Sequence, residues 1–89
     1  MHEEIKELLR VESSAIGNIP VTGSYMDVTE LLRRQVHEKG GKIIISGMGK
    51  AGQVANNMAT TFSSTGSPAV FLHPSEAQHG DLGILREND

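Results

Sequence analysis

Apolar residues recur every three or four positions along the first 40 residues, which is the spacing of amphipathic helices. The first set predicts a helix from about Glu3 to Ile19, weakened by Gly17 and stopped by Pro20. Its apolar stripe consists of Ile5, Leu8, Leu9, Ala15, Ile16 and Ile19. The stretch PVTGS then predicts a turn. A second helix is predicted from about Tyr25 to Lys39, with one apolar face formed by Met26, Leu31, Leu32 and Val36.

The pattern changes after Gly41. The stretch KIIIS has three β-branched residues in a row without alternation, which is typical of a parallel strand covered on both faces. Helical spacing returns in QVANNMATTFSSTG, where Gly66 is the expected stop and one face carries Val54, Ala55, Met58, Ala59 and Phe62. The stretch SPAVFL predicts a second short strand. Strand, glycine turn, helix and strand make a βαβ unit, so the predicted fold class is α/β with a parallel sheet.

The last 17 residues, HPSEAQHGDLGILREND, are polar and rich in ionisable groups. Ser75 and Gln78 have the spacing of a capping box, which predicts a short helix starting near Pro74 or Ser75. The final ILREND predicts a turn that leads toward another element.

The composition argues against several classes of protein and of binding site. The chain has 89 residues, a formal charge of −3 and no cysteine. A nucleic-acid binder normally shows a basic face, so no nucleic-acid partner is expected. The absence of cysteine excludes a disulfide framework and a thiolate zinc site. No apolar run is long enough to span a membrane, and the N-terminus lacks the apolar core of a signal peptide, so we expect a cytoplasmic protein without a membrane partner.

The loop SGMGKAG follows the first predicted strand and opens a helix. It fits the G-x-G-x-x-G fingerprint of dinucleotide sites, but that site also needs an acidic residue about 20 positions on. Leu72 and His73 occupy those positions, which disfavours a nicotinamide site. A triphosphate P-loop needs a glycine and a hydroxyl where this chain has Ile44 and Ala51.

Two interpretations of the loop remain open. Glycines expose backbone N–H groups, and a helix N-terminus carries a partial positive charge, so with Lys50 the loop suits an anion or a polarised oxygen. Alternatively, the glycines only form a tight turn and Lys50 is solvated.

Three motifs occur in order along the chain: SGMGKAG, STGSPAVFLHPSEA and HGDLG. Their combination resembles the sugar isomerase (SIS) domain, and within it the arabinose-5-phosphate isomerase family, which typically shows G-M-G-K-S-G, STGTP and HPxEAxHGDLG. The resemblance covers roughly Lys42 to Leu85, and the helices before Lys42 resemble the family only in pattern.

The resemblance implies an α/β sandwich around a five-stranded parallel sheet. It implies interconversion of D-arabinose 5-phosphate and D-ribulose 5-phosphate, which feeds synthesis of the lipopolysaccharide sugar Kdo, and a homo-oligomer, usually a tetramer. No cofactor is expected. We expect residues 1–41 to form an N-terminal helical segment and residues 42–89 to form the first βαβ part of a SIS domain, truncated after about two strands.

This chain departs from the family pattern at two positions. Ala51 stands where the family commonly has serine, and Gln53 where it often has histidine. The family's Ser/Thr-rich phosphate loop and the glutamate assigned the proton transfer belong after Asp89. We therefore expect the 89-residue fragment to be inactive. Two short parallel strands with three helices leave an open sheet edge and an uncovered apolar face, so we also expect the fragment to be poorly stable and self-associating.

Aldose–ketose isomerisation moves a proton between adjacent carbons through an enediol, so it needs an acid–base group with a pKa near neutrality and a donor to the charged oxygen. By resemblance, Lys50 is the donor and His79 moves a proton or orients the open chain. The expected substrate-binding residues are Ser46, Gly47, Gly49, Gly52 and Glu76.

Plainer interpretations stand beside these assignments. A histidine before Gly-Asp, such as His79, is often a turn or cap residue, and His73 precedes a proline and is expected to end a strand. The spacing of His73, Glu76, His79 and Asp81 fits no strong zinc pattern, so no metal is expected. The rival functions are a non-catalytic phosphosugar-binding regulatory module and a dinucleotide-binding half-domain.

Overall fold

The structure is a computed structural model that describes all 89 residues. Every helix and strand predicted from the hydrophobic pattern is present, and one turn of 3₁₀ helix follows the last of them. In chain order the elements are α1 (His2–Gly17), α2 (Gly23–Leu32), the π-helical turn η1 (Arg33–Glu38), β1 (Ile43–Ile45), α3 (Gly49–Ser64), β2 (Ala69–Phe71), α4 (Pro74–Gln78) and the 3₁₀ turn η2 (Asp81–Ile84).

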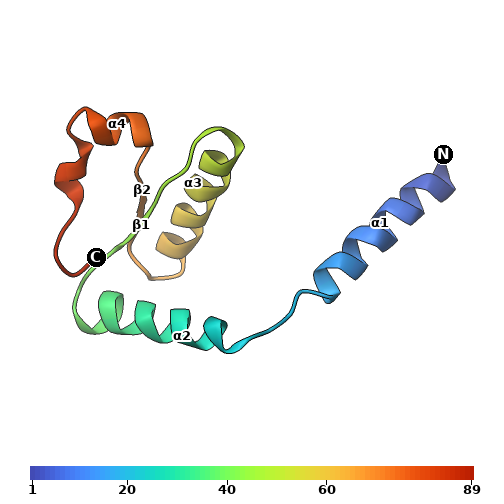
Figure 1. The fold of residues 1–89 in the computed structure, drawn as a ribbon, viewed down its shortest axis with the longest axis horizontal. Helices are drawn as coiled ribbons and strands as arrows, with labels where there is room; N and C mark the ends of the chain where they lie inside the picture. Colours follow the sequence, from blue (N-terminus) through green and yellow to red (C-terminus); the bar gives the residue numbers. More distant parts are fainter.

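The two strands form a parallel sheet in which Ile43, Ile44 and Ile45 pair with Ala69, Val70 and Phe71. The crossover helix α3 packs against both strands (Figure 1). Its contact face carries small residues, with Ala55 and Ala59 buried, so the helix backbone comes close to the sheet. The predicted α/β class with a parallel sheet is therefore confirmed.

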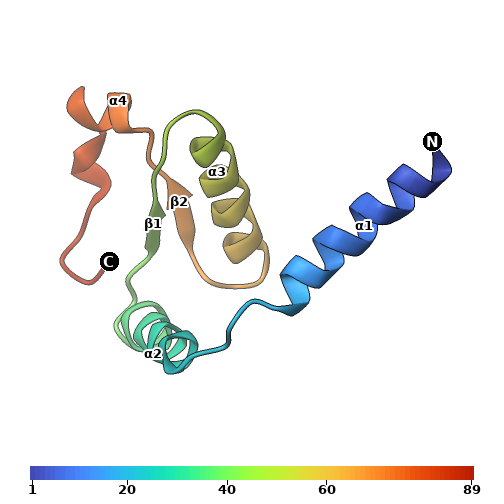
Figure 2. The same ribbon diagram turned by 45° about the vertical axis from the view of Figure 1, so that its right-hand side comes forward.

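The apolar core is small: its buried hydrophobic side chains belong to Val36, Ala55, Ala59 and Leu72. The isoleucines of β1 are only partly buried, because α3 is the one helix packed against both strands (Figure 2). The prediction of a strand covered on both faces is not met by these 89 residues. Likewise, only part of the predicted apolar face of α3 is buried. Ala55 and Ala59 are buried, whereas Val54 and Met58 are exposed.

The second helix starts two residues before the predicted Tyr25, with Thr22 as its N-cap. The α-helix itself ends at Leu32, and η1 continues the helical run to Glu38, close to the predicted end at Lys39 and the glycine pair, where Gly40 adopts a φ of 73°. Its predicted apolar face is only partly covered: Val36 is buried, but Met26 is 70% exposed. The rest of the protein therefore packs against Val36 in η1 and leaves most of α2 exposed.

The helix α4 begins where predicted, but its cap differs. His73 is the N-cap, and its Nδ1 accepts a hydrogen bond of 3.1 Å from the backbone N–H of Ser75. The predicted capping box of Ser75 and Gln78 is wrong, because His73 already caps the helix from the end of the strand.

The last five residues turn back to the start of β1 (Figure 1). The ammonium group of Lys42 lies 2.7 Å from the Asp89 carboxylate, whose other oxygen accepts from the backbone N–H of Lys42 at 3.0 Å. Gln35 Nε2 donates to the carbonyl oxygen of Asn88 at 3.1 Å. The predicted ILREND turn is therefore present, and hydrogen bonds join it to η1 and to Lys42, the residue before β1.

The first helix projects away from this body (Figures 1 and 2). None of its residues is buried. The radius of gyration is 17.2 Å, whereas a compact domain of this length would have about 12 Å. No helix of the protein combines the length and the apolar character that crossing a bilayer requires.

Candidate functional site

The parallel pairing of β1 and β2 brings the ends of both strands to one edge of the sheet. The backbone N–H of Leu72 donates to the carbonyl oxygen of Ile45 at 2.9 Å, so the chain leaves both strands at the same level. The loop Ser46–Met48 leads from β1 into α3, and His73 leads from β2 into α4 (Figure 1). In open parallel sheets, ligands bind outside such carboxyl ends of strands.

The glycines between the first strand and α3 have two separate structural roles. Gly49 has a φ of 59°, in the left-handed region that favours glycine, and it starts the helix. Gly47 and Gly52 bring loop and helix into contact: a Cβ on Gly52 would lie 2.6 Å from the carbonyl oxygen of Gly47. The sequence hypothesis of a tight strand-to-helix turn is therefore correct for the backbone.

That turn also leaves hydrogen-bond donors free for a ligand. No side chain caps α3, whose N-cap is Met48, so the first backbone N–H groups of the helix lack side-chain acceptors. Lys50 lies in this first turn and is exposed. A 16-residue helix with a free N-terminus and an adjacent ammonium group attracts negative charge.

A hollow of about 200 Å³ lies at the carboxyl ends of the strands. We call it the strand-end hollow, and its lining residues are Gly47, Gly49, Gly52, Gln53, Asn56, Phe71 and His73. The rings of Phe71 and His73 meet edge to face, with centroids 6.1 Å apart and an angle of 89° between their planes. Because its Nδ1 accepts from Ser75, the neutral His73 ring carries its proton on Nε2 and has that group free as a donor.

The structure gathers some of the predicted site residues and separates others. Gly47, Gly49 and Gly52 all line the strand-end hollow, and Lys50 lies between the last two along the chain. Ser46 is exposed at the end of the first strand. The remaining two residues belong to α4: Glu76 is exposed, and His79 is the C-cap, with its backbone N–H donating to the Glu76 carbonyl oxygen at 3.0 Å.

Neither Glu76 nor His79 lines the strand-end hollow. The side chains of Lys50, Glu76 and His79 make no hydrogen bond or ion pair within the chain, so all three are free to meet a ligand or another part of a larger protein. The histidines and carboxylates of this region form no group of three able to hold a metal ion.

Sequence reasoning missed four residues of the hollow, although their spacing carried a signal. Gln53 and Asn56 follow Gly49 by four and seven positions, so all three share one face of α3. Phe71 and His73 are two positions apart, which places both on one face of an extended chain. Gln53, Asn56 and Phe71 carry no ionisable group and belong to none of the patterns that identify catalytic residues, and His73 was expected only to end a strand.

Comparisons with known proteins agree on one family. The family profile described as SIS domain matches residues 21–89. A Francisella tularensis protein named arabinose 5-phosphate isomerase KdsD is 40% identical over 86 residues, which are 97% of this chain and 24% of that protein. An Escherichia coli protein named arabinose 5-phosphate isomerase KpsF is 39% identical over 88 residues, which are 96% of this chain and 26% of that protein.

Two solved structures are similar over nearly the whole chain. A Bacteroides fragilis protein, described as a candidate phosphosugar isomerase involved in capsule formation, superposes with a TM-score of 0.95 and 65% identity, over 100% of this chain and 46% of that one. The protein c3406 of Escherichia coli CFT073, in complex with arabinose 5-phosphate, gives a TM-score of 0.79 and 33% identity, over 98% of this chain and 45% of its own. This chain thus spans about a quarter of those two curated relatives and just under half of the solved structures.

Proposed function

Because the chain belongs to the SIS domain family, we propose that it forms part of a phosphosugar aldose–ketose isomerase. The resemblance stated from the three motifs is confirmed by these relatives. The observation that supports the proposal most strongly is the strand-end hollow, where an uncapped helix N-terminus and glycine amides lie beside Lys50 in a chain similar to isomerases of arabinose 5-phosphate.

We place one end of the sugar phosphate in the strand-end hollow. Its volume of about 200 Å³ is below the roughly 300 Å³ at which pockets for complete small ligands begin. The hollow therefore suits a phosphate or a few hydroxyl groups, and the rest of the ligand extends beyond Gly47 and Gly49. The protein c3406, which matches 98% of this chain, was solved in complex with arabinose 5-phosphate, and that complex supports a ligand of this class.

The proposed reaction moves one proton from C2 to C1 of the sugar through an enediol, while the hydroxyl proton passes between the two oxygens. Lys50 donates a hydrogen bond to the oxygen that gains charge in this step, and His79 carries the proton between oxygens. Ser46, Gly47 and Gly49 bind the substrate through backbone groups and a hydroxyl. The N–H of Gly52 donates to the Met48 carbonyl oxygen at 3.1 Å, so Gly52 contributes to substrate binding as part of the lining of the hollow. Glu76 holds a reacting group in position.

Several finer assignments belong to the same proposal. The substrate pair is D-arabinose 5-phosphate and D-ribulose 5-phosphate, and the reaction supplies Kdo synthesis in the cytoplasm. The expected division into a helical segment, residues 1–41, and the first part of the SIS domain, residues 42–89, also belongs to the proposal, with the family profile matching from residue 21 onward. Since His79 does not line the strand-end hollow, residues outside this chain complete the site, and the 89 residues alone are inactive.

The same position of His79 favours a second candidate, a non-catalytic phosphosugar-binding module. An assay of the full-length protein separates the two candidates. Turnover of arabinose 5-phosphate to ribulose 5-phosphate supports the isomerase. Saturable binding measured by calorimetry, without turnover, selects the binding module, and neither binding nor turnover contradicts both.

A further inference from the structure

The chain from Pro74 to Asp89, which we call the strap, carries His79 and has little apolar support. It leaves β2 at the carboxyl edge of the sheet, passes through α4 and η2, and returns to the amino end of β1 (Figures 1 and 2). None of its residues is buried, and Leu82 and Leu85 are 53% and 43% exposed. A segment with few buried apolar contacts opens easily, so the position of the strap depends on polar contacts at its two ends.

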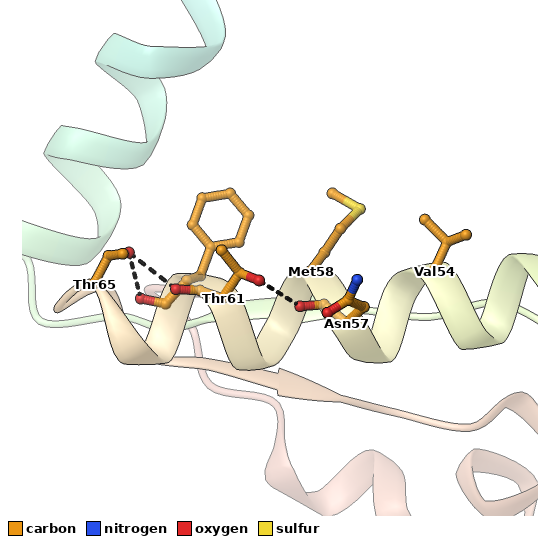
Figure 3. A pocket seen from close by; sticks show the side chains of 6 residues that line it. Val54, Asn57, Met58, Thr61 and Thr65 are labelled. Carbon is orange, nitrogen blue, oxygen red and sulfur yellow. Dashed lines mark hydrogen bonds between the residues drawn. The ribbon is translucent and has the colours of Figure 1, made fainter. Parts of the chain in front are cut away.

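The helix α3 gives the strap little support along its length. Figure 3 shows Val54 and Met58 of α3 pointing away from β2, the strand from which the strap leaves. The residues of α3 that pack toward the sheet are the small Ala55 and Ala59. The elements of the strap, α4 and η2, pack closely on each other.

The first end of the strap is fixed by the cap of α4, where the backbone N–H of Ser75 donates to His73 Nδ1 at 3.1 Å. The helix ends at His79, and the next residue, Gly80, has a φ of 123° in the range that favours glycine. Because a glycine joint accepts many conformations, the cap fixes where α4 begins but does not set the direction of η2.

The second end of the strap is fixed by Lys42 and Asp89. The Lys42 ammonium group donates to the carbonyl oxygen of Ile84, at the end of η2, and lies 2.7 Å from the Asp89 carboxylate. That carboxylate also accepts from the backbone N–H groups of Lys42 at 3.0 Å and Arg86 at 2.8 Å. We call these four residues the strap clasp.

The strap clasp is better protected from water than any other ion pair of the chain. The side chains of Lys42 and Asp89 are 24% and 11% exposed. In the other five ion pairs, both partners are more than half exposed. Exposed ion pairs contribute little to structure, whereas partial burial strengthens the attraction between charges.

The residues beside the clasp fit together closely. Gln35 Nε2 donates to the carbonyl oxygen of Asn88 at 3.1 Å, and Asn88 Nδ2 donates to that of Lys39 at 3.3 Å. A Cβ on Gly41 would overlap the Asn88 carbonyl group, so the two backbones are in direct contact. The second end of the strap is therefore a fitted junction with η1 and the start of β1.

On the basis of the role in proton transfer proposed for His79, we propose that Lys42 and Asp89 are positioning residues for this histidine. His79 precedes Ile84 by only five positions, and the turn η2 fills this stretch. A shift of η2 at Ile84 therefore moves His79 with it. Misplacing a catalytic group by about 1 Å can lower the rate roughly 10²-fold.

The clasp should affect the reaction rate without affecting substrate binding. It lies at the amino end of β1, whereas the strand-end hollow lies at the carboxyl end, and the two share no residue. Loss of the clasp therefore leaves the hollow intact and releases only the segment that carries His79.

Kinetics of the full-length protein with arabinose 5-phosphate test this separation. Asp89→Asn and Lys42→Met should each lower kcat about tenfold or more, with KM changed by less than about twofold. Lys42→Arg keeps the positive charge and should retain most of kcat. The matched control is Glu30→Gln, which makes the same chemical change at the exposed pair with Arg33. Equal kcat values for Asp89→Asn and Glu30→Gln, or a loss that only matches the fraction of unfolded protein, would overturn the proposal.

Nuclear magnetic resonance of the same protein, with ¹³C at histidine Cε1, measures the effect without turnover. Single His→Gln variants assign the resonances. In Asp89→Asn the His79 resonance should shift or broaden, whereas His73, held by its own cap, and His2, on α1, should not change. An unchanged His79 resonance, or an equal change at His73, would contradict positioning by the clasp. If the unchanged protein does not convert arabinose 5-phosphate, the proposed function fails, and these resonances still decide whether the clasp positions His79.

Discussion

The backbone of Gly52 lies directly against the carbonyl oxygen of Gly47, so closely that a Cβ on Gly52 would come within 2.6 Å of that oxygen. The same Cβ would lie 3.6 Å from the ring carbon Cζ of Phe71. This contact joins the loop after β1, the first turn of α3 and the end of β2. It therefore sets the shape of the strand-end hollow.

The substitution Gly52→Ala should destabilise the full-length protein by about 1–3 kcal/mol, because the added methyl group forces the loop away from the helix. The free energy of unfolding from urea titration measures this change. Gly17→Ala is the control, since a Cβ there meets nothing within 4 Å, and it should be neutral or stabilising by up to about 1 kcal/mol. Equal stability of the two variants would show that the Gly47–Gly52 contact is not required.

Removing the ammonium group at the start of α3 should affect catalysis more than binding. If Lys50 donates to the oxygen that gains charge, Lys50→Ala should lower kcat roughly 10²–10³-fold with little change in KM. The folded state should be unaffected, because the Lys50 side chain makes no hydrogen bond or ion pair within the chain. Lys39→Ala, at the end of η1, is the control for loss of one positive charge. A kcat within threefold of the unchanged protein would remove Lys50 from the mechanism.

His73 has two separable roles, as helix cap and as part of the strand-end hollow. His73→Ala should lower the free energy of unfolding by about 0.5–2 kcal/mol, because the Ser75 N–H loses its acceptor. His73→Asn supplies another acceptor and should retain most of that stability. If the ring also contacts substrate, His73→Asn should raise KM despite normal stability. An unchanged KM would limit His73 to its structural role.

The ion pair between Lys42 and Asp89 should make stability depend on acid pH. The Lys42 ammonium group, together with backbone donors, holds the pKa of the Asp89 carboxyl below its usual value of 3.8. The stabilisation is therefore complete above about pH 4 and is lost as the pH falls through the lower pKa of the folded state. Asp89→Asn should lower the Tm at pH 7, and the difference from the unchanged protein should shrink below pH 4. A difference that stays constant over this range would contradict the pairing.

The sequence pattern located the secondary structure well, because each element carries a local signal. Gly49 and Gly66 adopt positive φ angles at the start and beyond the end of α3, where glycine was expected to punctuate the helix. The run Ile43–Ile45 forms a parallel strand as its β-branched residues predicted. Such signals depend on neighbouring residues alone, so one sequence is enough to find them.

Burial was harder to predict, since it depends on contacts between distant parts of the chain. Helical spacing put Val54 and Ala55 on one face of α3, but only the small Ala55 fits against the sheet. The residues that line the strand-end hollow were hard to predict for the same reason. Its glycines were found from their motif, whereas Gln53 and Phe71 meet there only because α3 crosses back over the parallel strands.

A crystal structure of the full-length protein with arabinose 5-phosphate would show directly whether the strand-end hollow binds a phosphorylated sugar. We expect ligand density against the backbone N–H groups at Gly47, Gly49 and Lys50, with the Lys50 ammonium group in hydrogen-bond reach of a ligand oxygen. Ordered ligand bound elsewhere, with the hollow between these glycines and His73 empty, would contradict it.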